Sequence, residues 1–166
     1  MNATETARLL AICAATFPQY PITKETVSVY AEMLADVPYD HAERGLRDLL
    51  MTTDRWPSIA AIRRKVAERM GTLAPEKALA WAEVRAQITA VGRQGSPNFS
   101  HPVIREAVRT FGWWELCMSE NLETTRAQFW RVYDELQTNH DRQAITGIGF
   151  GPAAIEAQDA ALALEG

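Results

Sequence analysis

The sequence is poor in cysteine and has no long apolar run. It contains only two cysteines among 166 residues, Cys13 and Cys117, which excludes a disulfide framework and is typical of a cytoplasmic protein. No segment approaches the roughly 18 consecutive apolar residues that a membrane helix requires. The first residues also lack the basic start and apolar stretch of a signal peptide. We therefore expect no contact with a membrane.

An excess of basic charge is also missing. Seventeen lysines and arginines stand against 21 aspartates and glutamates, which gives a net charge of −4. This balance argues against a protein that binds nucleic acid over its whole surface, because phosphate binding requires clustered basic residues. Residues 1–71 hold nine charges of each sign, residues 72–142 hold eight basic and nine acidic, and residues 143–166 hold three acidic and none basic. This distribution fits a protein-binding adaptor.

Signatures of catalysis and of cofactor binding are absent as well. There is no glycine-rich phosphate loop with a lysine, and His41, His101 and His140 have no cysteine or carboxylate partner at metal-ligand spacing. Cys117 and His101 are a conceivable nucleophile–base pair, but a free cysteine usually packs as a small hydrophobic residue. The carboxylates are explained as helix caps and solvated faces, among them Glu32, Asp36, Glu43 and Asp48. We expect no enzyme, no cofactor and no metal.

What the sequence does have is alanine, with 26 copies, while the Val-, Ile- and Thr-rich runs of a sheet are missing. Alanine is the best helix former because it loses no side-chain entropy in a helix. The expected fold class is therefore all-α. Apolar residues at helical spacing predict helices over about 4–17, 24–36, 38–50, 58–71, 76–91, 100–112 and 121–144, with a short turn or helical piece near 113–117.

Residues at the ends of these segments predict where the helices begin and end. Asn2 with Glu5 has the pattern of a capping box, and Gly71 and Gly112 are expected to end helices. The expected N-caps of later helices are Thr23, Asp40, Ser58, Ser100 and Asn121. We predict a four-helix unit over residues 1–71, a second helical unit over 72–142 and a flexible tail over 143–166.

A cluster of positive charge surrounds the fourth predicted helix. Its five basic residues are interrupted only by Asp54 beforehand and by Glu68 within: Arg55, Arg63, Arg64, Lys65 and Arg69. Such a cluster can contact phosphate groups or a partner protein. The alternative is the solvated face of an amphipathic helix whose other side carries Ile59, Ile62 and Val66. The sequence leaves both interpretations open.

The predicted tail contains three large apolar residues spaced among alanines, Ile155, Leu162 and Leu164. Residues 153–164 are compatible with a transient helix. A flexible segment of this kind can fold onto the groove of a partner, so these three residues are the predicted partner contacts. A frayed chain terminus is the alternative.

Aromatic residues of the second half are expected in its core. Trp and Phe at helical spacing bury large areas and dominate packing. A base-stacking platform is the alternative, although lysine and arginine are not interleaved with these residues. The group consists of Trp81, Phe99, Trp113, Trp114, Phe129, Trp130 and Tyr133.

Several short features of the first seventy residues carry a resemblance to a known family. They are Tyr20-Pro21 before a Thr-capped helix, the face Tyr30…Met33-Leu34, the break Val37-Pro38-Tyr39, and Trp56-Pro57-Ser58-Ile59…Ile62-Arg63 at the start of the next helix. In these features the chain resembles the phage replicative-helicase loader/inhibitor family. The second half, with AWAEVRAQI, GSPNFSHPVIREAVRTFGWWELC and TTRAQFWRVYDEL, is similar to a segment of phage and prophage replication-associated proteins.

The resemblance implies a non-enzymatic adaptor in the cytoplasm of a bacterial host. Such an adaptor binds the hexameric replicative helicase, restrains its unproductive ATP turnover and delivers it to an origin-binding initiator protein. A compact helical N-terminal domain and a flexible C-terminal part that contributes to helicase contact are implied as well. Two other functions stay open: a DNA-binding replication or regulatory protein, with a weak DNA contact through residues 55–69, and a structural phage protein, which a large homo-oligomer would favour.

Overall fold

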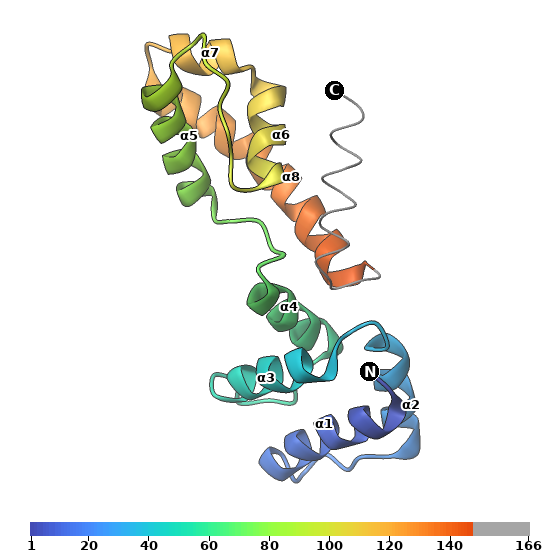
Figure 1. The fold of residues 1–166 in the computed structure, drawn as a ribbon. Helices are drawn as coiled ribbons and strands as arrows, with labels where there is room; N and C mark the ends of the chain where they lie inside the picture. The colour runs from blue at the N-terminus through green and yellow to red at the C-terminus, as the bar shows by residue number, and fades with distance from the viewer. Residues whose placement is uncertain (148–166) are drawn as a thin grey trace. The chain divides into compact units, whose positions relative to one another are not determined.

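The computed structural model describes residues 1–147, and these residues form eight α-helices and no strand (Figure 1). The all-α prediction is confirmed. Two compact units are present: Met1–Thr72 together with the described residues from Ala144 on, and Leu73–Gln143. The predicted partner contacts Ile155, Leu162 and Leu164 lie outside the described residues. No helix within residues 1–147 combines the length and the apolar character needed to cross a membrane.

The first unit packs four helices around an aliphatic core. These helices are α1 (Ala3–Thr16), α2 (Lys24–Met33), α3 (Tyr39–Leu50) and α4 (Ile59–Met70). Helix α1 packs on α2 and α3, and α3 packs on α4. Their apolar stripes meet because residues three and four apart share a helix face. The fully buried side chains of this core include Leu9, Leu10, Leu34, Val37, Leu46, Ile62 and Val66.

Most of the predicted helix ends of the first unit are confirmed. Asn2 and Glu5 form the capping box, and the Ser58 side chain accepts a hydrogen bond from the N–H of Ala61. Gly71 adopts the left-handed conformation, with φ of 68°, that ends α4. The prediction of an Asp40 cap was wrong: α3 already begins at Tyr39, after Pro38, and Asp40 lies in its first turn. There its carboxylate complements the helix dipole instead.

The second unit is built around aromatic rings. It contains α5 (Lys77–Val91), α6 (Pro102–Phe111), α7 (Trp113–Met118) and most of α8 (Leu122–Thr146), whose last residues belong to the first unit. The ring of Phe129 lies 5.3 Å from that of Trp81 and 5.8 Å from that of Tyr133, between ring centroids. Phe129 and Tyr133 are completely buried. This core confirms the interpretation of Trp81, Phe129 and Tyr133 as packing residues.

Two details of the second unit differ from the prediction. His101 caps α6 in place of Ser100, because Pro102 occupies the first helical position and the Nδ1 atom of His101 accepts the N–H of Val103. Ser100 instead donates hydrogen bonds to Glu83 from both its N–H and its hydroxyl. Trp114, which was expected in the core, is 53% exposed on α7.

Candidate functional site

The structure separates the five basic residues that the sequence groups together. Arg63 is buried, whereas Arg55 and Arg64 are exposed. Lys65 and Arg69 form ion pairs with Glu68 and Asp48, respectively. Arg55 lies 3.5 Å from Asp54. Among the described residues, the cluster is therefore a set of paired and solvated charges around one buried arginine, which leaves few cations available to phosphate groups.

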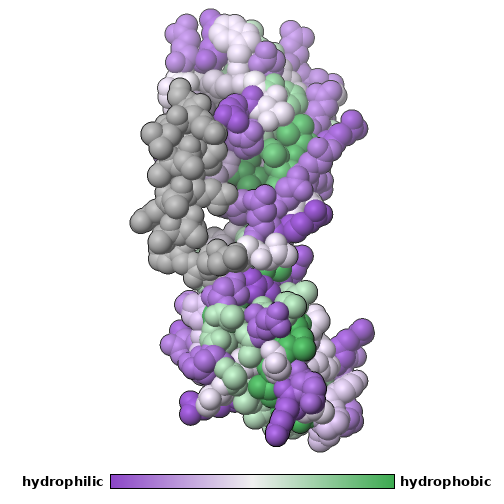
Figure 2. All heavy atoms as spheres, turned by 90° about the vertical axis from the view of Figure 1, so that its right-hand side faces the viewer, coloured by the Kyte–Doolittle hydropathy of each residue, from purple (hydrophilic) through white to green (hydrophobic). Residues whose placement is uncertain are grey.

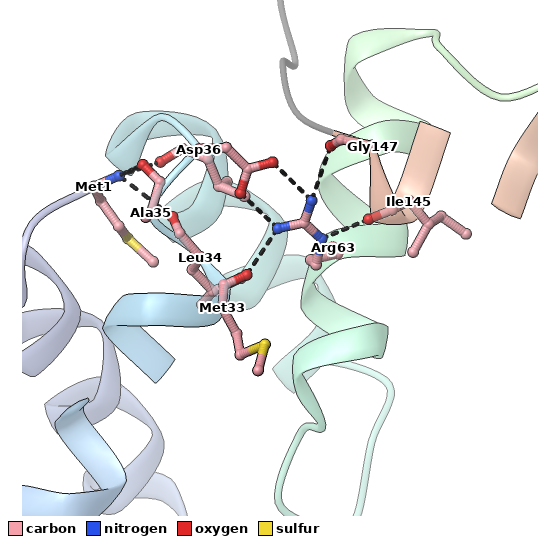
Figure 3. Close-up of polar contacts among 9 residues, drawn as sticks. Met1, Met33, Leu34, Ala35, Asp36, Arg63, Ile145 and Gly147 are labelled. Carbon is pink, nitrogen blue, oxygen red and sulfur yellow. Dashed lines mark hydrogen bonds and ion pairs between the residues drawn. The ribbon is translucent and has the colours of Figure 1, made fainter. Parts of the chain in front are cut away.

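The guanidinium group of Arg63 is the centre of a polar network in the first unit (Figure 3). Its Nη1 and Nη2 atoms donate to the two carboxylate oxygens of Asp36, each at 2.7 Å. Nη1 also donates to the carbonyl of Met33 at 2.8 Å. Nε donates to the carbonyl of Ile145, and Nη2 donates to that of Gly147 at 3.2 Å. The five N–H groups of a guanidinium thus have five acceptors.

This network satisfies two helix ends at once. The carbonyl of Met33 belongs to the last residue of α2, and the carbonyls of Ile145 and Gly147 lie at the end of α8. Carbonyls at a helix C-terminus have no partner within the helix, and the helix dipole makes this end favourable for a cation. Arg63 provides a cation to both ends, while the bidentate pair with Asp36 fixes its orientation.

A second cation lies on the other side of the same turn (Figure 3). The amino group of Met1 donates to the carbonyls of Ala35 at 2.7 Å, Val37 at 2.8 Å and Leu34 at 3.3 Å. The turn that follows α2 is thus held between an ammonium and a guanidinium group. Neither role was predicted from the sequence. For Arg63 a signal exists, since it lies four residues after Ile59 and three before Val66, on the apolar side of the helix.

A hollow of about 470 Å³ opens beside this network in the first unit. The side chains of Met33 and Ile59 form apolar walls, and the Arg63–Asp36 pair lies at its polar end. The remaining lining residues are Glu32, Ala35 and Thr146. Because Thr146 is the last residue of α8, the hollow lies where the described part of the chain ends.

Residues that carry the sequence resemblance meet in a second cluster of the first unit. The rings of Tyr20 and Trp56 lie 5.8 Å apart between centroids. The indole Nε1 of Trp56 donates to the hydroxyl of Tyr30 at 3.0 Å, and that hydroxyl donates to the carbonyl of Pro57 at 3.1 Å. Burial raises the pKa of Tyr30. This chain of hydrogen bonds fixes the segment before α4 against α2, so the motif residues have a structural role.

The outer side of α2 presents large apolar side chains to solvent. Val29 is 49% exposed and Met33 is 51% exposed, and the two lie one helical turn apart. Tyr20 is 47% exposed nearby in the sequence. Figure 2 views the side of the first unit on which α2 lies, and hydrophobic residues are visible on its surface there. Clustered apolar and aromatic side chains of this kind are typical of protein-binding surfaces.

The second unit does not bring Cys117 and His101 into a reactive pair. His101 caps α6, and its ring packs against that of His140 with 4.8 Å between centroids. Burial raises the pKa of the Cys117 thiol, whereas a nucleophilic cysteine requires a lowered pKa. Within residues 1–147, no three His, Cys, Asp or Glu side chains are grouped so that they could hold a metal ion.

Comparison with known proteins connects only the first unit to a family. Residues 1–63 match the model of a family described as the N-terminal domain of the phage gp39 protein. The match includes α1, α2, α3 and the beginning of α4, and it ends at the buried Arg63. No curated protein and no solved structure matches the chain.

Proposed function

We propose that this protein is a phage DNA-replication accessory protein that binds the replicative helicase and loads or inhibits it. The match of residues 1–63 with the N-terminal domain of the gp39 protein carries this proposal. It falls on the region whose motifs resemble the helicase loader/inhibitor family. The protein acts as an adaptor without catalysis of its own, and delivery to an origin-binding initiator is part of the same hypothesis.

Two surfaces are available for the helicase. One is the exposed apolar side of α2 with Val29 and Met33. The other is the C-terminal segment with Ile155, Leu162 and Leu164, which carries acidic residues and no basic ones. Apolar side chains that are exposed in the free protein gain the most from burial in a partner's groove. We assign the main helicase contact to the C-terminal segment and a supporting contact to α2.

The test is a binding assay with the replicative helicase of the host or phage, with helicase ATP turnover measured in parallel. The triple variant Ile155→Ser, Leu162→Ser, Leu164→Ser is expected to weaken binding at least tenfold, because each buried aliphatic side chain contributes about 1.5–3 kcal/mol. A matched control replaces three alanines of the same segment, Ala154→Ser, Ala157→Ser and Ala161→Ser. If the unmodified protein binds neither helicase, the proposal fails.

The alternative of a DNA-binding protein receives less support from this geometry. Phosphate contacts would depend on Arg55 and Arg64, since Arg63 is buried and Lys65 and Arg69 are paired. Binding through so few cations would be weak and would fall steeply as salt rises. The same helicase assay with added single- and double-stranded DNA separates the two functions.

A further inference from the structure

The hollow beside Met33 and the end of the described chain lie together in the first unit. Thr146 lines the hollow, and the carbonyl of the next residue, Gly147, accepts a hydrogen bond from Arg63. Arg63 is itself held by both carboxylate oxygens of Asp36. The chain therefore continues into residues 148–166 from a point that is fixed against the first unit. Whatever those residues carry is delivered next to the hollow.

The surface around this point is apolar and accessible. We define the α2/α4 surface as the side chains of Val29, Met33 and Ile59. Val29 and Met33 are about half exposed on one side of α2, and Ile59 forms the facing wall of the hollow on α4. Exposed aliphatic and thioether side chains adapt to many apolar partners, methionine most of all.

The segment that follows has the matching pattern. Ile155 and Leu162 are seven residues apart, so in a helix over residues 153–164 they lie on one side, about 10 Å apart. Leu164 lies on the opposite side of that helix. Eight residues connect Gly147 to Ile155, and at about 3.4 Å per residue they span at most about 27 Å. A short tether of this kind gives an effective concentration on the order of millimolar.

We propose that in the free protein the segment 153–164 binds the α2/α4 surface of its own chain through Ile155 and Leu162. Docking covers the same two side chains that the proposed function assigns to the helicase. The contact is therefore autoinhibitory, and in this regulatory meaning it rests on the proposed function. The helicase must compete with the α2/α4 surface, so its apparent affinity is reduced by the fraction of the protein that is undocked.

Methionine methyl groups make the docking measurable in the full chain. Met33 is part of the α2/α4 surface, whereas Met51, which is 86% exposed at the end of α3, is a reference outside it. In a protein labelled with ¹³C at its methionine methyls, the double variant Ile155→Ser, Leu162→Ser is expected to shift the Met33 signal and leave the Met51 signal in place. Met33→Leu assigns the signal, and it keeps the backbone carbonyl that Arg63 contacts.

The matched control is Leu164→Ser, which makes the same chemical change on the opposite side of the predicted helix. It is expected to leave the Met33 signal unchanged. An unchanged Met33 signal in the double variant would overturn the proposal, and so would an equal shift in the control. A shift that depends on protein concentration would also overturn it, because the contact would then join two chains.

Helicase binding tests the regulatory consequence separately. If nine-tenths of the free protein is docked, Val29→Ser with Met33→Ser raises the affinity of the full chain for the helicase about tenfold. A decrease would identify the α2/α4 surface as a helicase contact and overturn autoinhibition. If the Met33 signal shifts as expected but no form of the protein binds a helicase, the docking stands and the proposed function fails. If the helicase binds and the Met33 signal does not shift, the docking alone fails.

Discussion

The two units of this molecule reach a stable core with different side chains. The core of the first unit is aliphatic, with Leu9, Leu46 and Ile62 fully buried and Phe17 as its buried aromatic residue. The second unit packs Trp81, Phe99, Phe129 and Tyr133 together. An aromatic ring buries about 150–250 Å² and interacts through its orientation as well as its area. The second unit thus depends on a few large rings, while the first depends on many small contacts.

The units also differ in how they satisfy polar groups near their cores. In the first unit, charged groups cap the carbonyls after α2, namely the Arg63 guanidinium and the Met1 ammonium. In the second, neutral groups do so: the hydroxyl of Tyr133 donates to the carbonyl of Pro75 at 2.7 Å, and the indole of Trp113 donates to that of Gly92 at 3.2 Å. This difference predicts that the first unit is sensitive to lost charge and the second to lost volume.

The largest expected effect is the loss of a ring from the second unit. Phe129→Ala removes the side chain between Trp81 and Tyr133 and is expected to lower the free energy of unfolding by about 3–5 kcal/mol. Hydrogen exchange read by mass spectrometry should accelerate in peptides from residues 73–143. Four of the five tryptophans belong to this unit, so a red shift of the fluorescence should accompany the change.

The matched variant in the first unit is Leu46→Ala, another fully buried position. It is expected to lower the free energy of unfolding by about 2–5 kcal/mol, with the faster exchange in peptides from residues 1–72. Because the two cores are separate, each variant should act mainly on its own unit. Equal acceleration across both units in either variant would contradict the comparison.

The success of the sequence predictions follows the same division. Helix positions and most ends could be predicted, because apolar spacing and capping residues such as Asn2, Ser58 and Gly71 act locally. The exposure of Trp114 could not, because it depends on how the short helix α7 packs in three dimensions. The role of Arg63 was missed for a related reason: its acceptors lie about 30 and 80 residues away along the chain.

A smaller effect is expected from removing the charge at the centre of the first unit. Arg63→Met leaves the carboxylate of Asp36 without its bidentate partner, and that carboxylate is only 19% exposed. Loss of one member of a buried ion pair costs about 3 kcal/mol. Denaturant unfolding followed by circular dichroism measures this cost. The exposed neighbour gives the control, since Arg64→Met should change stability by less than about 0.5 kcal/mol.

The double variant Arg63→Met, Asp36→Ala separates the pair from its surroundings. Because it leaves no unpaired carboxylate, it should be at least as stable as Arg63→Met alone. A double variant that is less stable by the sum of both single effects would show that the two side chains act independently. In that case the comparison between a charge-dependent first unit and a volume-dependent second unit would fail.

The smallest effect concerns the two thiols, one in each unit. Burial raises the pKa of Cys13 to about 11 and also raises that of Cys117, which is only partly buried. At pH 8 the native protein should be alkylated first at Cys117 and far more slowly at Cys13, as mass spectrometry of the labelled peptides would reveal. Denaturant should abolish the difference, because both thiols then have ordinary pKa values.

The raised pKa of Cys13 also predicts a dependence of stability on pH. Between the ordinary value near 9 and the folded value of about 11, the unfolded chain releases the thiol proton and the folded chain keeps it. Stability therefore falls as pH rises through this window, and it is unaffected below it. Tyr30 and Tyr133 add their own alkaline loss, since burial raises the pKa of both. The part due to Cys13 is the difference in slope from Cys13→Ala, and an identical slope in that variant would show that the thiol is not the buried group it is taken to be.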